Sequence, residues 1–203
     1  MELRNTKVIL RPMRREDIAD RIFWETEDTE WQLWDGPWDY EGKSPEERAA
    51  ALAQARAVWE ARVAAPVGPG PALRLEICLN APGAPHVGWI SAYQIDDQCC
   101  ISETGERCAV GLTIPGGAVR GKGYGFAALC LYIRYLLDCG VAEIYTQTWS
   151  GNVRMIALAE KLGFRLFLRK PGLRTVRGER YDGLTFRLDM ERFLSLNETG
   201  RNP

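Results

Sequence analysis

The sequence predicts one α/β domain with a mixed, mostly antiparallel sheet flanked by helices. Alternating apolar residues predict strands over Leu73–Leu79, Val87–Ile95 and Arg107–Ile114, an order that favours an antiparallel meander. The last of these strands continues into a glycine loop, an apolar helix and a further strand over Glu143–Trp149, which is the order of a crossover between parallel strands. The sheet is therefore expected to contain one parallel pair.

Length and composition limit the class of protein. A chain of 203 residues is long enough for one domain with a substantial core, and we assign residues 1–194 to it and residues 195–203 to a polar C-terminal tail. The formal net charge of −1 gives no basic face for nucleic acid. No apolar run approaches the roughly 20 residues of a membrane helix. With no signal peptide pattern at the start, we expect a cytoplasmic protein.

The cysteines predict neither disulfides nor a metal site. Six cysteines are scattered without a Cys-x-x-C pair, and His86 is the only histidine. Zinc ligation needs clustered cysteine and histidine side chains. We expect free, buried thiols and no metal.

The N-terminal part is expected to form a strand, a helix, a loop and a second helix. Met1–Met13 alternates as a strand, and Arg14–Glu27 has helical spacing. Ser44–Glu47 places Ser at the N-cap, Pro at N1 and Glu at N3, which predicts a helix reaching about Ala64. Pro66–Pro71 is interpreted as a surface loop.

The C-terminal part predicts a buried helix and a closing hairpin. The helix over Gly125–Cys139 is apolar almost all round, so we expect it to be buried. Phe164–Leu168 and Tyr181–Leu188 read as the two strands of the hairpin. The basic stretch Arg169–Arg180 between them is interpreted as a solvated loop, with contact to an acidic acceptor as the alternative.

The glycine loop has the pattern of an anion site. The segment Arg120–Gly125 alternates Arg, Lys and Tyr with glycines, which keeps side chains off the inner wall of the turn. Backbone N–H groups and the positive end of the following helix can then face one ligand. We expect a phosphate there.

Two nucleotide motifs match this loop incompletely. Gly116–Lys122 follows the G-x-x-x-x-G-K pattern of a P-loop, but Gly123 stands where the magnesium-binding Ser or Thr belongs. The spacing in Gly121–Gly125 is G-x-G-x-G, whereas a dinucleotide fingerprint needs G-x-G-x-x-G. A nucleotide hydrolase is therefore kept only as a third alternative.

Two motifs together resemble a known family. The form Arg120-x-x-Gly123-x-Gly125 resembles the pyrophosphate-binding motif of the GNAT superfamily of acyl-CoA-dependent N-acetyltransferases. Downstream, Asn152–Phe164 is similar to its segment from Asn to Leu-Gly-Phe. The motifs have the family's order and lie about one βα unit apart. The resemblance covers Leu3 to Leu188 and is closest to the branch of ribosomal-protein N-terminal acetyltransferases, which also contains antibiotic and polyamine acetyltransferases.

The resemblance implies where the cofactor lies. In the family, the strands before and after the glycine loop splay apart, and the acyl-pantetheine arm fills the gap. The exposed edge of Leu112–Ile114 would pair with the pantetheine amides like an added strand. Asn152 would lie beside that arm, with a simple N-cap as the alternative. The expected acetyl-CoA contacts are Leu112, Thr113, Ile114, Arg120, Gly121, Lys122, Gly123, Tyr124, Gly125 and Asn152.

One departure from the family concerns the general acid. Many members have a Tyr that protonates the CoA thiolate, and Ala159 stands at that position. Ser150 and Tyr181 are candidate substitutes, and bulk water is another because a thiolate with a pKa of about 8.5 is a fair leaving group.

The acceptor is expected to meet an aromatic loop. Tryptophans in Trp24–Tyr40 are either core anchors or, together with acidic residues, a site for a cationic amine through cation–π contacts and ion pairs. Asp35 and Asp182 are the candidates for amine handling. The expected acceptor contacts are Trp34, Asp35 and Trp38.

These observations predict an acyl-CoA-dependent N-acyltransferase. It would transfer an acetyl group from acetyl-CoA to a primary amine of a small molecule or a protein N-terminus by direct attack, without a metal. The main alternative is a CoA-binding module with weak or no catalysis, which Ala159 favours. The expected partners are acyl-CoA and an amine, and a homodimer is among the candidate assemblies.

Overall fold

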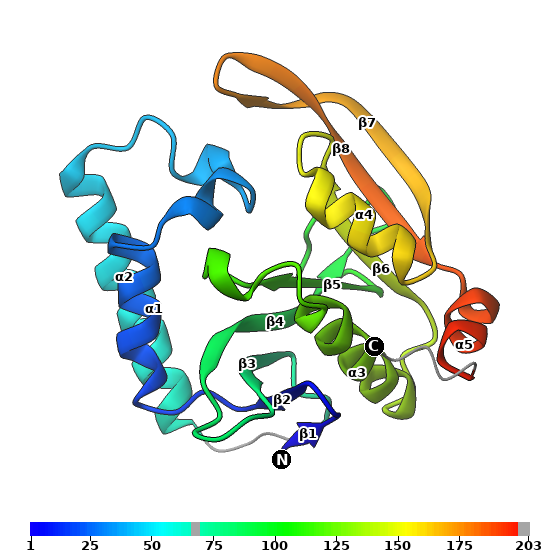
Figure 1. Ribbon diagram of the computed structural model, residues 1–203. Helices are drawn as coiled ribbons and strands as arrows, with labels where there is room; N and C mark the ends of the chain where they lie inside the picture. The colour runs from blue at the N-terminus through cyan, green and yellow to red at the C-terminus, as the bar shows by residue number, and fades with distance from the viewer. Residues whose placement is uncertain (66–69, 199–203) are drawn as a thin grey trace.

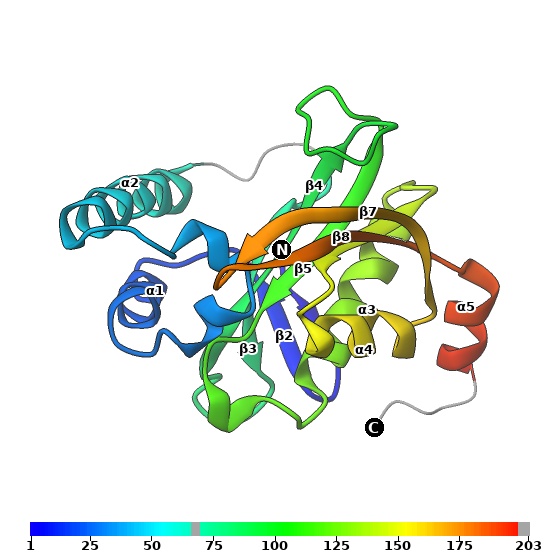
Figure 2. The same cartoon turned by 90° about the horizontal axis from the view of Figure 1, so that it is seen from above.

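The computed structural model describes residues 1–65 and 70–198, which form one mixed sheet with helices on both faces (Figures 1 and 2). The strands are β1 (Leu3–Arg4), β2 (Val8–Arg11), β3 (Arg74–Leu79), β4 (His86–Ile95), β5 (Arg107–Thr113), β6 (Ile144–Trp149), β7 (Phe164–Val176) and β8 (Glu179–Leu188). The helices are α1 (Asp17–Thr26), α2 (Pro45–Ala64), α3 (Tyr124–Asp138), α4 (Val153–Lys161) and α5 (Met190–Glu198), with 3-10 turns η1 (Glu30–Leu33), η2 (Pro37–Asp39) and η3 (Gly117–Val119).

The sheet confirms the predicted fold class. Its eight strands follow the order β1-β2-β3-β4-β5-β6-β8-β7, and neighbours are antiparallel except for β5 and β6. Fully buried Leu129 and Ile133 of α3 belong to the same apolar cluster as Leu10 and Ile90 of the sheet, so α3 is buried as its apolar sequence predicts. On the other face, α1 and α2 enclose a smaller core.

The parallel pair separates where the pocket opens. Residues 108–110 of β5 pair with residues 144–146 of β6, and the pairing stops after Val110. Beyond it β5 continues beside β4, where Thr113 lies opposite Trp89, while β6 continues beside β8 up to Trp149. The splayed strand pair is therefore confirmed.

Helix α2 begins as its sequence predicts. The Ser44 hydroxyl accepts a hydrogen bond from the backbone N–H of Glu47, and the Glu47 carboxylate accepts one from the N–H of Ser44 at 2.7 Å. Pro45 occupies the first turn, where its missing N–H costs nothing.

Three boundaries of the structure differ from those expected. The single N-terminal strand is two strands, because the Asn5 side chain accepts hydrogen bonds from the N–H groups of Lys7 and Val8 and turns the chain. Helix α1 begins at Asp17 rather than Arg14. Helix α5 continues to Glu198, where a polar tail was expected from residue 195. Residues 66–69 of the predicted surface loop and residues 199–203 lie outside the described chain.

The basic stretch 169–180 is also not a loop. Strands β7 and β8 form a long ribbon that extends beyond the sheet, shown in orange in Figure 1. Arg177 and Gly178 both have positive φ, at 51° and 82°, which is the geometry of a two-residue hairpin turn. Pro171 falls at a register shift on the edge strand, where its missing N–H breaks no ladder bond.

The cysteines agree with expectation in part. All six cysteines are free, but Cys100 and Cys139 are exposed rather than buried. Within the described residues, none of the helices has the length and apolar character that a membrane crossing requires.

Candidate active site

A pocket of about 780 Å³ lies where β5 and β6 separate. One half is bounded by the glycine loop and by α3 and α4, and the other by η1 and strand β4. Its volume is in the range of pockets that enclose a small-molecule ligand. The pocket lining includes Trp31, Trp34, Asp35, Trp89, Ser91, Tyr93, Leu112, Thr113, Ile114, Arg120, Gly121, Gly123, Tyr124, Gly125, Asn152 and Arg154.

The glycine loop forms the floor of the first half. Gly123 is the N-cap of α3 with φ +84°, a conformation that favours glycine. A side chain at Gly125 would lie 3.3 Å from Leu112, so a glycine lets α3 approach β5 closely. Lys122 does not line the pocket, because it is exposed and its carbonyl accepts a hydrogen bond from Lys7.

Two arginines beside this loop share one carboxylate. Arg120 forms an ion pair with Glu30, and Arg154 approaches the same carboxylate at 3.3 Å. Arg120 also donates to the Pro115 carbonyl at 2.8 Å, yet its Nε is buried and finds no hydrogen-bond partner in the described part of the chain. Sequence reasoning did not select Glu30, because its spacing does not distinguish it from a solvated charge.

The edge of β5 is open to the pocket. Leu112, Thr113 and Ile114 all line it, and the β6-facing side of residues 111–113 has no strand partner within the described chain. An extended ligand could add main-chain hydrogen bonds there.

Asn152 has a capping role and also joins two segments. Its side-chain oxygen accepts a hydrogen bond from the N–H of Met155 at 3.1 Å, as an N-cap does. Its amide nitrogen donates to the Trp34 carbonyl at 3.0 Å, and the Trp149 indole donates to the same carbonyl at 2.8 Å. The aromatic loop (Trp24–Tyr40) is thereby fixed against the start of α4.

Asp35 faces the pocket from the end of this loop. Its carboxylate accepts a hydrogen bond from the Thr113 hydroxyl at 2.5 Å. Asp35 is exposed to solvent through the pocket, and its carboxylate lies against Thr113. Partial desolvation of this carboxylate raises its pKa, the bond from Thr113 opposes that shift, and the charge of Asp39 adds to it. A carboxylate with a raised pKa is suited to accept a proton.

Strand β4 supplies aromatic side chains that sequence reasoning did not select. Trp89 and Tyr93 line the pocket, and burial, followed by the charge of Asp35, raises the pKa of Tyr93. Trp31 packs edge-on against Trp89 with ring centroids 5.2 Å apart. Alternation along the predicted strand could have placed both residues on one face, but nothing in the sequence showed that this face borders the pocket.

A comparison with protein families decides the assignment. The model of the acetyltransferase (GNAT) domain matches residues 7–165. The chain belongs to the GNAT acetyltransferase family. No curated protein matches it in sequence.

Solved GNAT structures are similar in fold. The GNAT-family acetyltransferase from Bacillus anthracis superposes with a TM-score of 0.67 at 13% identity, covering 93% of this chain and 98% of that one. A spermidine N-acetyltransferase chimera of Vibrio cholerae SpeG and hSSAT gives 0.63 at 14%, covering 92% and 98%. Salmonella typhimurium yncA, whose structure contains its cofactor acetyl-CoA, gives 0.59 at 19%, covering 91% and 94%.

The general-acid position of the GNAT family lies in the core. Ala159 is fully buried and packs with the apolar cluster around α3. It does not line the pocket. The residues of α4 that do line it are Arg154, Met155, Leu158 and Lys161.

Besides Lys122, four predicted site residues lie outside the pocket lining. The Ser150 hydroxyl accepts a hydrogen bond from the N–H of Asp182, and the Tyr181 hydroxyl donates to Glu179 at 2.9 Å. Asp182 accepts bonds from the Gly172 N–H and from Arg169, which together lower its pKa. Trp38 packs edge-on against Trp149. Ser150, Tyr181 and Asp182 form hydrogen bonds with residues of the β7–β8 ribbon. The sequence could not predict these bonds, because residues 169–180 were expected to form a loop.

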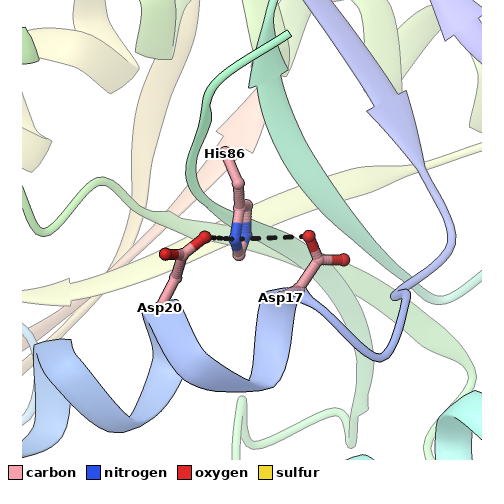
Figure 3. Close-up of side chains that lie close together, drawn as sticks. All are labelled: Asp17, Asp20 and His86. Carbon is pink, nitrogen blue, oxygen red and sulfur yellow. Dashed lines mark hydrogen bonds and ion pairs between the residues drawn. The ribbon is translucent and has the colours of Figure 1, made fainter. Parts of the chain in front are cut away.

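One group of side chains has the spacing of a metal site. Figure 3 shows His86 between Asp17 and Asp20 of α1. Both oxygens of Asp17 already accept hydrogen bonds from Arg11, at 2.6 and 2.7 Å, and His86 also bonds to Glu76 at 2.9 Å. Burial alone would lower the pKa of His86, but its bond to Glu76 and the surrounding carboxylates raise it. Protonated His86 is therefore a member of an ion-pair cluster.

Proposed function

We propose that this GNAT acetyltransferase transfers an acetyl group from acetyl-CoA to a primary amine by direct attack. The observation that supports it most is the hydrogen bond between Asp35 and Thr113. It joins a carboxylate on the acceptor side of the pocket to the strand that borders the cofactor side. A base and the predicted thioester site are thereby brought into one cavity.

The residues of the first half fit an acyl-CoA molecule. The unpaired edge of residues 111–113 suits the pantetheine amides, and the loop N–H groups at the start of α3 suit the pyrophosphate. The buried, unpartnered Nε of Arg120 is a further donor beside that loop. Acetyl-CoA supplies an acetyl group activated as a thioester.

Asp35 handles the proton of the amine. An amine is mostly protonated at neutral pH and becomes a nucleophile only after it loses a proton. The raised pKa of Asp35 makes it a better acceptor than an ordinary carboxylate. The indoles of Trp31 and Trp34 can hold the ammonium form beside it. A backbone N–H of residues 112–114 would stabilise the oxyanion that forms on attack.

The acceptor is proposed to be an amine of a small molecule or of a protein N-terminus. Resemblance to the ribosomal-protein branch supports the second, and the aromatic walls with one carboxylate suit either. We place the enzyme in the cytoplasm, because its free cysteines are typical of a reducing compartment.

A panel of amines tests this proposal. The wild-type protein is incubated with acetyl-CoA and each amine, and thiol release is measured together with the mass of the product. Asp35→Asn should lower kcat/KM for the amine about ten- to a hundredfold with little change in acetyl-CoA affinity. The exposed Asp138 at the end of α3 lies outside the pocket lining, so Asp138→Asn is the matched control. Binding of acetyl-CoA without amine-dependent thiol release would instead support a CoA-binding module.

A further inference from the structure

A second cavity of about 70 Å³ lies between helices α1 and α2 and strands β3 and β4. Three arginines from three elements converge on it: Arg21 from α1, Arg62 from α2 and Arg74 from β3. We call this the arginine cavity. Its remaining lining residues are Trp59, Leu75, Glu76, Trp89, Ile90 and Ser91.

Arg21 is held firmly at the inner end of the cavity. Its side chain is only 7% exposed, and its guanidinium lies 3.6 Å from the ring centroid of Trp89 and 5.5 Å from that of Trp59. Its Nε is 3.4 Å from Glu76 without hydrogen-bond geometry, so this buried nitrogen has no hydrogen-bond partner among the described residues. Such a donor is costly to leave unsatisfied.

The cavity has more positive charge than its one carboxylate can balance. Glu76 is shared between Arg21 and the histidine His86, which approaches it at 2.9 Å. Among the residues that the structure describes, neither Arg62 nor Arg74 has a carboxylate within ion-pair distance.

The electrostatic effects agree with this geometry. Burial lowers the pKa of Arg21 to about 10, and the nearby charge of Arg62 contributes in the same direction. Burial also lowers the pKa of Arg62, and the charge of Arg74 adds to it. The three guanidinium groups therefore repel one another across the cavity, and a bound anion would relieve the repulsion.

We propose that Arg21, Arg62 and Arg74 form a binding site for a compact oxyanion, a phosphate or a carboxylate group. Guanidinium groups bind both in bidentate geometry. A cavity of about 70 Å³ has room for a group of this size but not for a whole nucleotide or sugar phosphate. Glu76 leaves the site net positive because its charge is shared with His86.

The oxyanion has two possible sources. Trp89 and Ser91 line both the arginine cavity and the main pocket, so the two cavities share a wall on β4. The ligand is either a free anion or an acidic group carried by the acceptor. The second possibility, an acidic group on the acceptor, rests on the proposed acetyltransferase function, whereas binding of a free anion does not.

Inorganic phosphate is the probe for the site. Its affinity is measured by calorimetry, and its effect on Tm is measured against sodium chloride of equal ionic strength. CoA is added in excess so that the glycine loop does not bind the phosphate. The variants are Arg62→Gln, Arg74→Gln and their combination. The control is Arg56→Gln, because Arg56 is exposed on the same helix and pairs with Glu60.

Phosphate should raise the Tm of the wild type and of the control, and the double variant should bind it at least about tenfold more weakly. In chloride, the double variant should be no less stable than the wild type, because two repelling charges are gone. Equal phosphate binding by wild type and double variant would overturn the proposal, as would no binding to the wild type. A double variant that is less stable in chloride would show that the arginines are structural and would also overturn it. These comparisons do not require the protein to be an active acetyltransferase.

Kinetics distinguish the two sources. If the acceptor carries the anion, the double variant should raise KM about tenfold for an amine with a carboxylate and leave KM unchanged for its uncharged analogue. If the anion is free, phosphate should bind as above and both KM values should stay unchanged.

Discussion

At the scale of single residues, one hydroxyl connects the two halves of the pocket. Thr113 is a buried residue of β5, and it donates to the carboxylate of Asp35. Partial desolvation raises the pKa of Asp35, this bond opposes the shift, and the charge of Asp39 adds to it. The strand that borders the proposed cofactor site therefore helps to set the protonation of the proposed base.

Replacing that hydroxyl should shift the pH dependence of the reaction. Thr113→Val keeps the shape of the side chain but removes the hydrogen bond that stabilises the charged form, so the pKa of Asp35 should rise further. A base acts only when deprotonated, and the acidic limb of kcat/KM should therefore move to higher pH. The pH profile for one amine checks this, with the exposed Thr175→Val as control. An acidic limb that stays in place would remove Asp35 from the proton transfer.

The sequence predicted some of these residues and missed others for identifiable reasons. The loop glycines and Asn152 follow local motifs, Asp35 was selected because it lies among tryptophans, and all of them line the pocket. No local pattern marked Glu30 or Tyr93 as a pocket residue. They line the pocket because η1 and strand β4 come together there in the folded chain. Asp182 was misplaced because its partner Arg169 was assigned to a loop rather than to a paired strand.

At the scale of elements, the aromatic loop is held by both neighbouring structures. The Trp34 indole donates to Glu30, and the Trp34 carbonyl accepts bonds from Asn152 and Trp149. From the other side, Arg177 at the tip of the β7–β8 ribbon donates to the Leu33 carbonyl. The ribbon and α4 therefore both hold the aromatic loop, which lies on the proposed acceptor side of the pocket. Figure 2 shows the tip of the ribbon beside this loop.

Glu30 should weaken the binding of an anionic cofactor. It neutralises Arg120 and Arg154 beside the glycine loop, and CoA phosphates would compete for the same cations. Glu30→Gln should tighten acetyl-CoA binding up to about fivefold at low salt, since ion pairs this exposed are worth about 1 kcal/mol or less. The difference should fade as salt rises.

Calorimetry at two salt concentrations measures this effect, with Glu60→Gln as a control because Glu60 is exposed and paired on α2. Weaker binding by Glu30→Gln would mean that Glu30 holds the arginines in place for the cofactor instead of competing with it.

Elements with local signals were predicted well. The capping box starts α2, and apolar faces identify α3 and the central strands. The ribbon was missed because its charged residues lack alternation, and its existence depends on the turn at Arg177 and Gly178 and on the irregularity around Pro171. The splay of β5 and β6 came from the family resemblance, since no local pattern specifies where two parallel strands separate.

At the scale of the whole molecule, a buried ionic cluster attaches α1 to the sheet. His86 of β4 bonds to Asp20 of α1 at 3.0 Å and to Glu76 of β3 at 2.9 Å. Asp17 and its partner Arg11 complete the contact, and Arg21 faces Glu76 from the same helix. Helix α1 leads into the aromatic loop, so this cluster helps to position the acceptor side.

The cluster should make stability depend on pH. The pKa of His86 is raised in the folded state, so its contribution is complete below its unfolded pKa of about 6.5 and is lost as pH rises through the folded value. Asp17 acts oppositely, because its pKa is lowered and its contribution is lost only as pH falls. The gap in Tm between wild type and His86→Gln should therefore be largest near pH 6 and shrink toward pH 9. A gap that is constant over this range would show that His86 acts through packing alone.

The account depends most on the binding of acyl-CoA where β5 and β6 separate. A calorimetric titration of acetyl-CoA into the wild-type protein tests it most directly, with ATP and magnesium as the competing ligand and Gly123→Val as the variant. Gly123 has φ +84°, and a β-branched side chain there would resist this conformation and occupy the space of the pyrophosphate. We predict one acetyl-CoA site in the wild type, loss of binding in a folded variant, and no binding of ATP. Binding of ATP with magnesium in place of acetyl-CoA, or undiminished acetyl-CoA affinity in Gly123→Val, would contradict the account.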